Sequence, residues 1–147
     1  MIKARKVDEV KSVWFEWDED FLVKIRYINK RELDKIRKKA TVTTFKRGGK
    51  VVEEVDTDKF AREYMDVAIL DWKGMRYKHL LEICEDIEIE EDPEKEIEYS
   101  EENKEFILEN FNLDFSSFIL EAVKNVLRVE KELQESGEKN LKNTSNG

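Results

Sequence analysis

Residues 56–74 follow a helical repeat of hydrophobic and polar positions more closely than any other part of the chain. At 100° per residue the apolar side chains fall within one sector, and most charged side chains fall outside it. Asp56 is a suitable N-cap, and Gly74 can adopt the left-handed conformation that follows many helix ends. We therefore predict a central helix over residues 56–74, around which the other elements pack.

Two other segments alternate apolar and polar residues with a period of two, as β-strands do when one face of a sheet is buried. Residues 12–28 alternate on both sides of a turn at Asp18–Asp20, and residues 41–55 carry β-branched residues on both sides of Gly48–Gly49. Each segment predicts a β-hairpin. Trp14 departs from the alternation, and we expect the N-terminal residues to cover part of it.

Residues 29–40 predict a short helix between the two hairpins, because Asn29 and Glu32 are spaced as a capping box. A narrow apolar stripe gives this helix one buried face. Its other faces carry the densest basic cluster of the chain, namely Lys30, Arg31, Lys35, Arg37, Lys38 and Lys39. We interpret the cluster as a solvated helix face and not as a nucleic-acid arm, because no aromatic residues lie among the cations.

The segment after Gly74 is weakly periodic, and we expect one or two helical turns there. From Glu82 to Glu102, twelve of twenty-one residues are Asp or Glu. We expect an acidic connection over residues 82–99, as a loop or an irregular strand that its isoleucines hold to the core.

Helical patterns fill the C-terminal half. Ser100 is a suitable N-cap for one helix, and Asp114 for a longer one that runs to residue 133. Apolar residues recur at spacings of three and four along the longer helix, at Phe115, Ile119, Ala122, Val126, Val129 and Leu133. Phe118, Leu120, Val123 and Leu127 widen this seam. Two interpretations stay open: the core of the domain, or a face that also contacts a partner or a second copy of the chain.

These elements predict one α+β domain over residues 1–133, followed by a flexible polar tail over residues 134–147. The domain is expected to hold a small antiparallel sheet from the two hairpins, packed with four to five helices. Charged residues make up 42% of the chain and hydrophobic residues 39%, which indicates a thin core under a heavily charged surface. The net charge of −8 argues against non-specific binding to nucleic acids or anionic membranes.

The single cysteine, Cys84, excludes an intrachain disulfide and favours a reducing compartment. The longest apolar run has four residues, and the N-terminal segment lacks the apolar region of a signal peptide. We therefore expect a soluble, cytoplasmic protein.

Candidate chemistry is sparse. His79 is the only histidine, so a zinc site lacks ligands and we expect a surface or half-buried side chain. The acidic residues 82–102 lack the order of a calcium-binding loop. Asp71 projects into the apolar sector of the predicted central helix, where a structural contact is favoured over a catalytic role. We expect no catalytic residue, no cofactor and no metal.

Three stretches carry a resemblance to a known family: FLVKIRYINKRELDKIRKKAT from Phe21, DVAILDWKG from Asp66, and YSEENKEFILEN from Tyr99. Their order resembles that of the tail assembly chaperones of long-tailed phages and prophages, over roughly residues 12–130. The resemblance implies a noncatalytic protein of the host cytoplasm that binds the tape-measure protein and helps to recruit tail-tube subunits.

Such a chaperone needs an apolar face for amphipathic helices and a charged exterior. We expect the last helix to supply that face and to allow self-association, with Phe115, Phe118, Ile119, Val126 and Leu127 as partner-binding residues. The alternative function is an acidic inhibitor that mimics DNA, with the carboxylates of residues 82–102 in place of phosphates.

Overall fold

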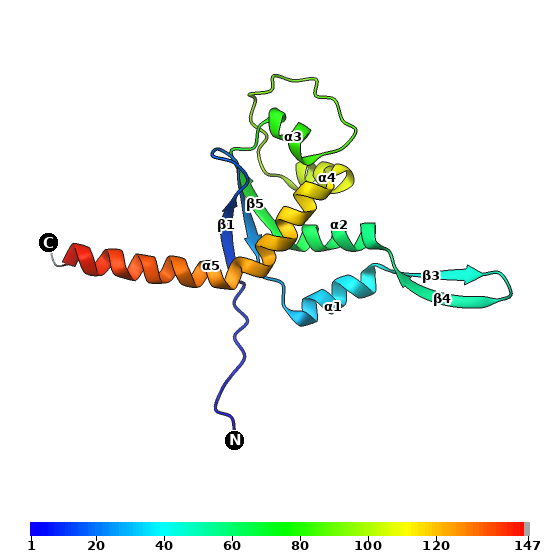
Figure 1. Ribbon diagram of the computed structural model, residues 1–147, viewed down its shortest axis with the longest axis horizontal. Helices are drawn as coiled ribbons and strands as arrows, with labels where there is room; N and C mark the ends of the chain where they lie inside the picture. Colours follow the sequence, from blue (N-terminus) through cyan, green and yellow to red (C-terminus); the bar gives the residue numbers. More distant parts are fainter. Residues whose placement is uncertain (146–147) are drawn as a thin grey trace.

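The computed structural model describes the backbone of residues 1–145 and the side chains of residues 1–137. The strands are β1 (Ser12–Glu16), β2 (Leu22–Arg26), β3 (Thr41–Lys46), β4 (Lys50–Val55) and β5 (Ile69–Lys73). The helices are α1 (Lys30–Lys39), α2 (Thr57–Ala68), α3 (Tyr77–Ile83), α4 (Glu101–Asn110) and α5 (Leu113–Ser145). This is the predicted α+β fold with a helical C-terminal half (Figure 1).

Both predicted hairpins form, and they lie in separate sheets. β1 and β2 pair with Phe15 opposite Val23, and β5 joins the other edge of β2 to give the order β1-β2-β5. β3 and β4 form a two-stranded sheet of their own, which projects from the body of the molecule (Figure 1). The second hairpin is tied to the body at its base, where the Asp56 N–H donates to the Ala40 carbonyl oxygen at 2.8 Å.

The predicted central helix over residues 56–74 begins as expected and ends early. Asp56 caps α2, since its carboxylate accepts from the N–H groups of Asp58 and Lys59 at 3.1 Å. The helix then stops at Ala68, and residues 69–73 form β5. The helix prediction is therefore wrong for residues 69–74, because these residues pair with the open edge of β2 instead of adding another helical turn.

A buried lysine from α4 stabilises the point where α2 becomes β5. The Lys104 Nζ donates to the carbonyl oxygens of Asp66 at 2.6 Å and Ile69 at 2.9 Å, and it lies 3.1 Å from the Asp66 carboxylate. A cation at this position satisfies carbonyl groups that a helix leaves unpaired at its C-terminal end. The contact joins residues 35 or more positions apart in sequence.

The core lies where α2 and the first half of α5 pack on the three-stranded sheet and on each other. α5 begins two residues earlier than predicted: the Asn112 side chain accepts from the Phe115 N–H at 2.9 Å, so Asn112 and not Asp114 is the cap. The largest fully buried side chains come from every layer, namely Phe21, Phe115, Ile25, Met65, Met75, Ile83, Ile107, Ile119, His79, Val23 and Val126.

The acidic connection is irregular, as predicted, and Ile87, Ile89 and Ile97 pack against the core. Two hydrogen bonds fix its second half, because Ile97 donates its N–H to Met75 and accepts at its carbonyl from the Trp72 indole, both at 2.8 Å. These contacts hold the connection beside α3 and α4.

α5 continues through residues 134–145, within the segment that the sequence predicts to be a flexible tail (residues 134–147), and the flexibility of that segment stays a prediction. Ion pairs between residues four positions apart stabilise the exposed turns of α5 that precede residue 134, such as the pair of Arg128 with Glu132 at 2.9 Å. Residues 146 and 147 lie outside the described part of the chain. Among the described helices none is long and apolar enough to span a bilayer.

Candidate docking surfaces

The structure divides the five predicted partner-binding residues between the core and the surface. Phe115, Ile119 and Val126 are buried and belong to the core of this structure, so their part in partner binding stays a prediction. They belong to the face of α5 that packs against the three-stranded sheet and α2. Phe118 is half-buried and packs edge-on against Trp17 at 5.2 Å between ring centroids. Leu127 is 47% exposed.

The apolar seam of α5 continues past the body of the molecule. Val126 is buried, Val129 is half-buried and Leu133 is 59% exposed, so the seam runs from the core into solvent along one helix. Figure 1 shows the second half of α5 extending away from the sheet. We call residues 127–137 the α5 extension. Leu127 and Leu133 are its exposed apolar side chains.

A second apolar surface is a groove between α3, the acidic connection and α4, with a volume of about 500 Å³. Its floor is apolar and includes Phe106, which is 44% exposed. A smaller hollow of about 330 Å³ adjoins it and shares three lining residues. We call the two hollows together the acidic-rimmed groove. The apolar lining consists of Tyr77, Leu80, Ile87, Ile89, Ile97, Phe106 and Ile107, and the carboxylates around it are those of Glu88, Glu90, Glu91, Glu102, Glu105 and Glu109.

The β3–β4 hairpin is the third exposed apolar surface. Its register places Phe45 opposite Val51, and Thr41 opposite Val55, on one face of the two strands. Phe45 is 78% exposed, and both valines are exposed as well. No other element of the described chain covers this face.

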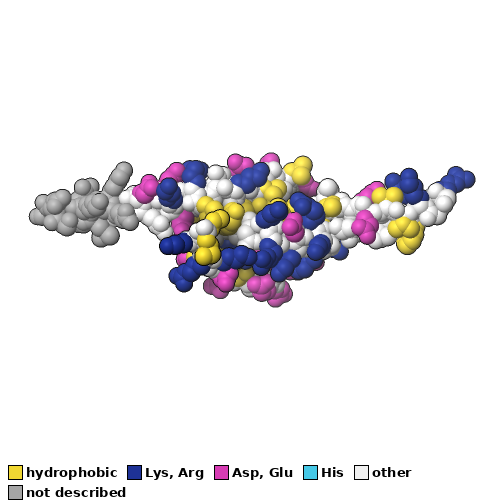
Figure 2. Space-filling model, turned by 90° about the horizontal axis from the view of Figure 1, so that it is seen from below, with side chains coloured by type: hydrophobic (Ala, Val, Ile, Leu, Met, Phe, Trp, Pro, Cys, Tyr) yellow, Lys and Arg dark blue, Asp and Glu magenta, His cyan; other side chains and the backbone are white. Residues whose placement is uncertain are grey.

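Basic side chains gather on two surfaces of this acidic protein. Figure 2 shows Lys and Arg along the underside of the body and again at the far tip of the hairpin. The first group includes the exposed cations of α1, whose apolar residues Ile36 and Ala40 are buried. The second group lies beside the exposed Phe45 and Val51.

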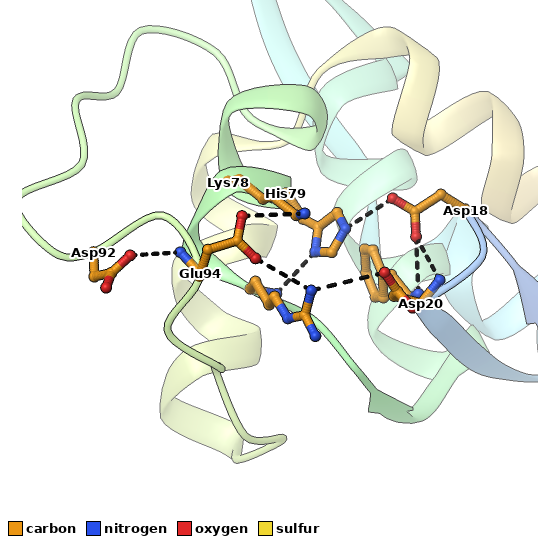
Figure 3. Close-up of polar contacts among 8 residues, drawn as sticks. Asp18, Asp20, Lys78, His79, Asp92 and Glu94 are labelled. Carbon is orange, nitrogen blue, oxygen red and sulfur yellow. Dashed lines mark hydrogen bonds and ion pairs between the residues drawn. The ribbon is translucent and has the colours of Figure 1, made fainter.

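Hydrogen bonds and ion pairs within the protein join the polar residues around His79 into one cluster. Sequence reasoning placed this side chain at the surface or half-buried, and that prediction is wrong, because His79 is fully buried. Its Nδ1 accepts from the Arg76 N–H and its Nε2 meets the Asp18 carboxylate, both at 2.8 Å (Figure 3). An Nδ1 that accepts leaves the proton on Nε2, which then donates to Asp18.

The same cluster joins three parts of the chain. The other oxygen of Asp18 accepts from the N–H groups of Asp20 and Phe21, both at 2.9 Å, and shapes the β1–β2 turn. Arg76 lies between Asp20 at 3.7 Å and Glu94 at 3.3 Å, so it links that turn to the acidic connection (Figure 3). The cluster therefore holds α3 against the turn and the connection.

Asp18 has a lowered pKa. Burial by itself raises the pKa, but the N–H groups of Asp20 and Phe21 and the His79 ring stabilise the carboxylate and outweigh burial. A lowered folded-state pKa adds stability above the ordinary value of 3.8, and that contribution is lost as the pH falls through the folded-state pKa.

Oxygen and nitrogen atoms of Asp18, His79 and Glu82 lie within 4.8 Å of one another, which raises the question of a metal ion. Hydrogen bonds already explain the arrangement. Glu82 accepts from the Trp17 indole at 3.4 Å, and a metal at Nε2 would have to displace the proton that Asp18 accepts. We therefore interpret the cluster as a set of hydrogen bonds.

Asp71, which seemed misplaced in a helix, has an ordinary position in β5. It lies opposite Lys24 on the outer face of the sheet, and its carboxylate accepts from the Trp72 N–H at 2.8 Å. Trp14 lies on the same face, with the Lys73 Nζ 4.3 Å from its ring centroid. Lysine side chains therefore lie over this tryptophan, where N-terminal residues were expected.

Comparison of the chain with protein-family models, with curated proteins and with solved structures gives no match. The resemblance to tail assembly chaperones therefore stays a proposal.

Sequence reasoning missed Lys104, the acidic-rimmed groove and the exposed hairpin face. The groove draws its lining from α3, the connection and α4, and no periodicity within one element marks it. The hairpin gave no decisive local signal, because a two-residue turn at Gly48–Gly49 would pair Phe45 with Val52. The observed register is centred on Gly48 and pairs Phe45 with Val51 instead.

Proposed function

We propose that this protein is a noncatalytic tail assembly chaperone of a long-tailed phage or prophage. In this role it binds the tape-measure protein in the host cytoplasm and helps to recruit tail-tube subunits. The observation that carries the proposal is the α5 extension, in which the apolar seam of the core runs out into solvent with Leu127 and Leu133 exposed.

A protruding amphipathic helix suits a long helical partner. Two such helices pack side by side when apolar residues of one fit between those of the other, and this contact needs no deep pocket. Charged side chains flank the apolar residues of the extension, among them Arg128 and Glu132. These charges keep the free chaperone and its complex in solution.

The buried residues of the predicted set have an indirect part in this function. Phe115, Ile119 and Val126 hold the first half of α5 on the sheet and thereby fix the direction in which the extension leaves the body. The proposed binding surface keeps Leu127 from the predicted set and adds Leu133, whereas Phe118 is half-buried against Trp17 in the body of the molecule.

The test is co-expression with a fragment of the tape-measure protein, which is expected as a long coiled-coil reading frame next to this gene. Wild-type protein should keep the fragment in solution and co-purify with it. The variant Leu127→Asp/Leu133→Asp should bind the fragment with an affinity that is lower by a factor of roughly ten or more, as expected when central apolar contacts are lost. Leu113→Asp is the matched control, because Leu113 is 77% exposed and lies outside the extension.

Two outcomes would overturn the proposal at different levels. If the double variant keeps its circular dichroism spectrum and still keeps the fragment soluble, the α5 extension is not the binding surface. If the wild-type chain leaves every fragment insoluble, it is not a tape-measure chaperone.

A further inference from the structure

We propose that the tip of the β3–β4 hairpin of one copy of this protein docks into the acidic-rimmed groove of a second copy. The inference concerns self-association, and it is independent of the tape-measure contact at the α5 extension.

The hairpin tip combines an apolar anchor with positive charge. Residues 45–51 contain Lys46, Arg47 and Lys50 and no carboxylate, and Phe45 and Val51 share one exposed face. Lys46 pairs with Glu54 at 3.5 Å, whereas Arg47 and Lys50 form no ion pair with the side chains that the structure describes. A cationic tip with an uncovered aromatic ring suits an apolar site with an acidic rim.

The groove has the complementary features. Its floor is apolar, its volume of about 500 Å³ suits several side chains, and carboxylates surround it. Glu105 pairs with Arg62, but Glu102 and Glu109 form no ion pair with any described side chain. Glu88 and Glu90 beside the smaller hollow are likewise unpaired within the described residues. The groove therefore offers negative charge that a cationic partner can neutralise.

The hairpin fits this groove better than the other basic surface does. In α1, Ile36 is buried and Leu33 is half-buried against the core, so α1 offers cations without an exposed apolar anchor. The hairpin also gains more from a partner, because a two-stranded hairpin with both faces in water is marginally stable by itself. Docking would cover Phe45, which is 78% exposed.

The contact has to be made between two copies. Figure 1 shows the hairpin projecting away from α3 and α4, so its tip does not reach the groove of its own chain. Two different surfaces meet in such a contact, and each copy carries both of them. An interface of this kind is head-to-tail, and it produces open chains of subunits or a closed ring instead of a symmetric dimer.

Sedimentation velocity tests the proposal on the full chain of 17.6 kDa. Measurements should span about 10 µM to about 1 mM, because a contact limited to a hairpin tip and one groove is expected to be weak. The wild-type protein should sediment faster as its concentration rises, and added salt should reverse the effect, since salt screens the cationic tip from the acidic rim.

Two variants separate the two surfaces. Phe45→Ser removes the apolar anchor of the hairpin, and Phe106→Ser removes the exposed ring of the groove. Each variant alone should remain a monomer over the whole range. An equimolar mixture should form dimers of one copy of each and nothing larger, because the intact hairpin of one variant can enter the intact groove of the other.

Two control variants test whether the contact is specific to the hairpin tip and the groove. Leu113→Ser changes an apolar residue that is as exposed as Phe45 and lies outside both surfaces, and Leu127→Asp changes the α5 extension. Both should associate like the wild-type protein. The proposal is overturned if the wild-type chain is a monomer throughout, if Phe106→Ser still associates, or if the mixture of variants stays monomeric. Loss of association in Leu127→Asp would move the contact to the last helix and would also overturn it.

Discussion

At the scale of single residues, Lys104 and Gly74 determine where the chain changes direction. Lys104 is a buried cation whose three contacts all lie at the end of α2. Gly74 has φ of 76°, and a Cβ atom there would lie 1.7 Å from the Asp20 carbonyl oxygen. Lys104 donates hydrogen bonds to the carbonyl groups at the end of α2, and Gly74 lets the end of β5 approach the β1–β2 turn.

We expect Lys104→Met to lower the free energy of unfolding by about 1–3 kcal/mol, because buried carbonyl groups lose their donor. The melting temperature should fall by roughly 3–9 °C for a chain of this size. Lys124→Met, on an exposed position of α5, serves as the control and should change stability by no more than about 0.5 kcal/mol. Equal melting temperatures for the two variants would contradict the role given to Lys104.

We expect Gly74→Ala to destabilise the protein by about 1–3 kcal/mol more than Gly49→Ala does, since only at Gly74 does a new methyl group meet backbone. Gly49 is the matched control, because its φ of 80° is nearly the same and its surroundings are open. Urea denaturation of both variants measures the difference. A difference near zero would mean that the turn moves away from Gly74 at no cost.

At the scale of elements, the two hairpins have different surroundings. The β1–β2 hairpin is covered by α2 and α5 and gains β5 at its free edge. The β3–β4 hairpin pairs only with itself. Similar alternating sequences thus give one strand pair inside the core and one in solvent.

We expect the amide hydrogens of β3 and β4 to exchange much faster than those of β2 at low protein concentration, because few tertiary contacts oppose local opening of the second hairpin. Hydrogen exchange followed by mass spectrometry measures both. Val23 and Ile25 of β2 provide the protected reference, as both are buried between neighbouring strands. Equal protection in dilute solution would show that the projecting hairpin is stabilised within one chain.

At the scale of the whole molecule, negative charge predominates but is unevenly distributed. The chain carries a net charge of −8, with the carboxylates concentrated around α3 and α4 and the cations on α1 and at the hairpin tip. Net repulsion between copies opposes association at long range, while the opposite charges of the hairpin tip and the groove rim attract at short range and favour one orientation of approach. The apolar surfaces lie on projecting parts, the hairpin and the α5 extension (Figure 1).

The sequence by itself determined the features that depend on neighbouring residues. Both hairpins, the capping box of α1, the caps Asp56 and Ser100, and the irregular acidic connection follow from local patterns, and the structure confirms them. The exposed position of Leu127 also follows from the width of the α5 seam, because one neighbouring layer cannot cover so many apolar residues.

Only the tertiary structure decided how far α2 runs, where His79 lies and which residues of α5 are available. Residues 69–73 have an apolar pattern that suits a helix or a strand, and the open edge of β2 together with Lys104 selects the strand. His79 is buried because the Asp18 carboxylate, 61 positions away in sequence, provides a polar partner for its Nε2. In each case the deciding contact comes from a distant part of the chain, which a local pattern does not contain.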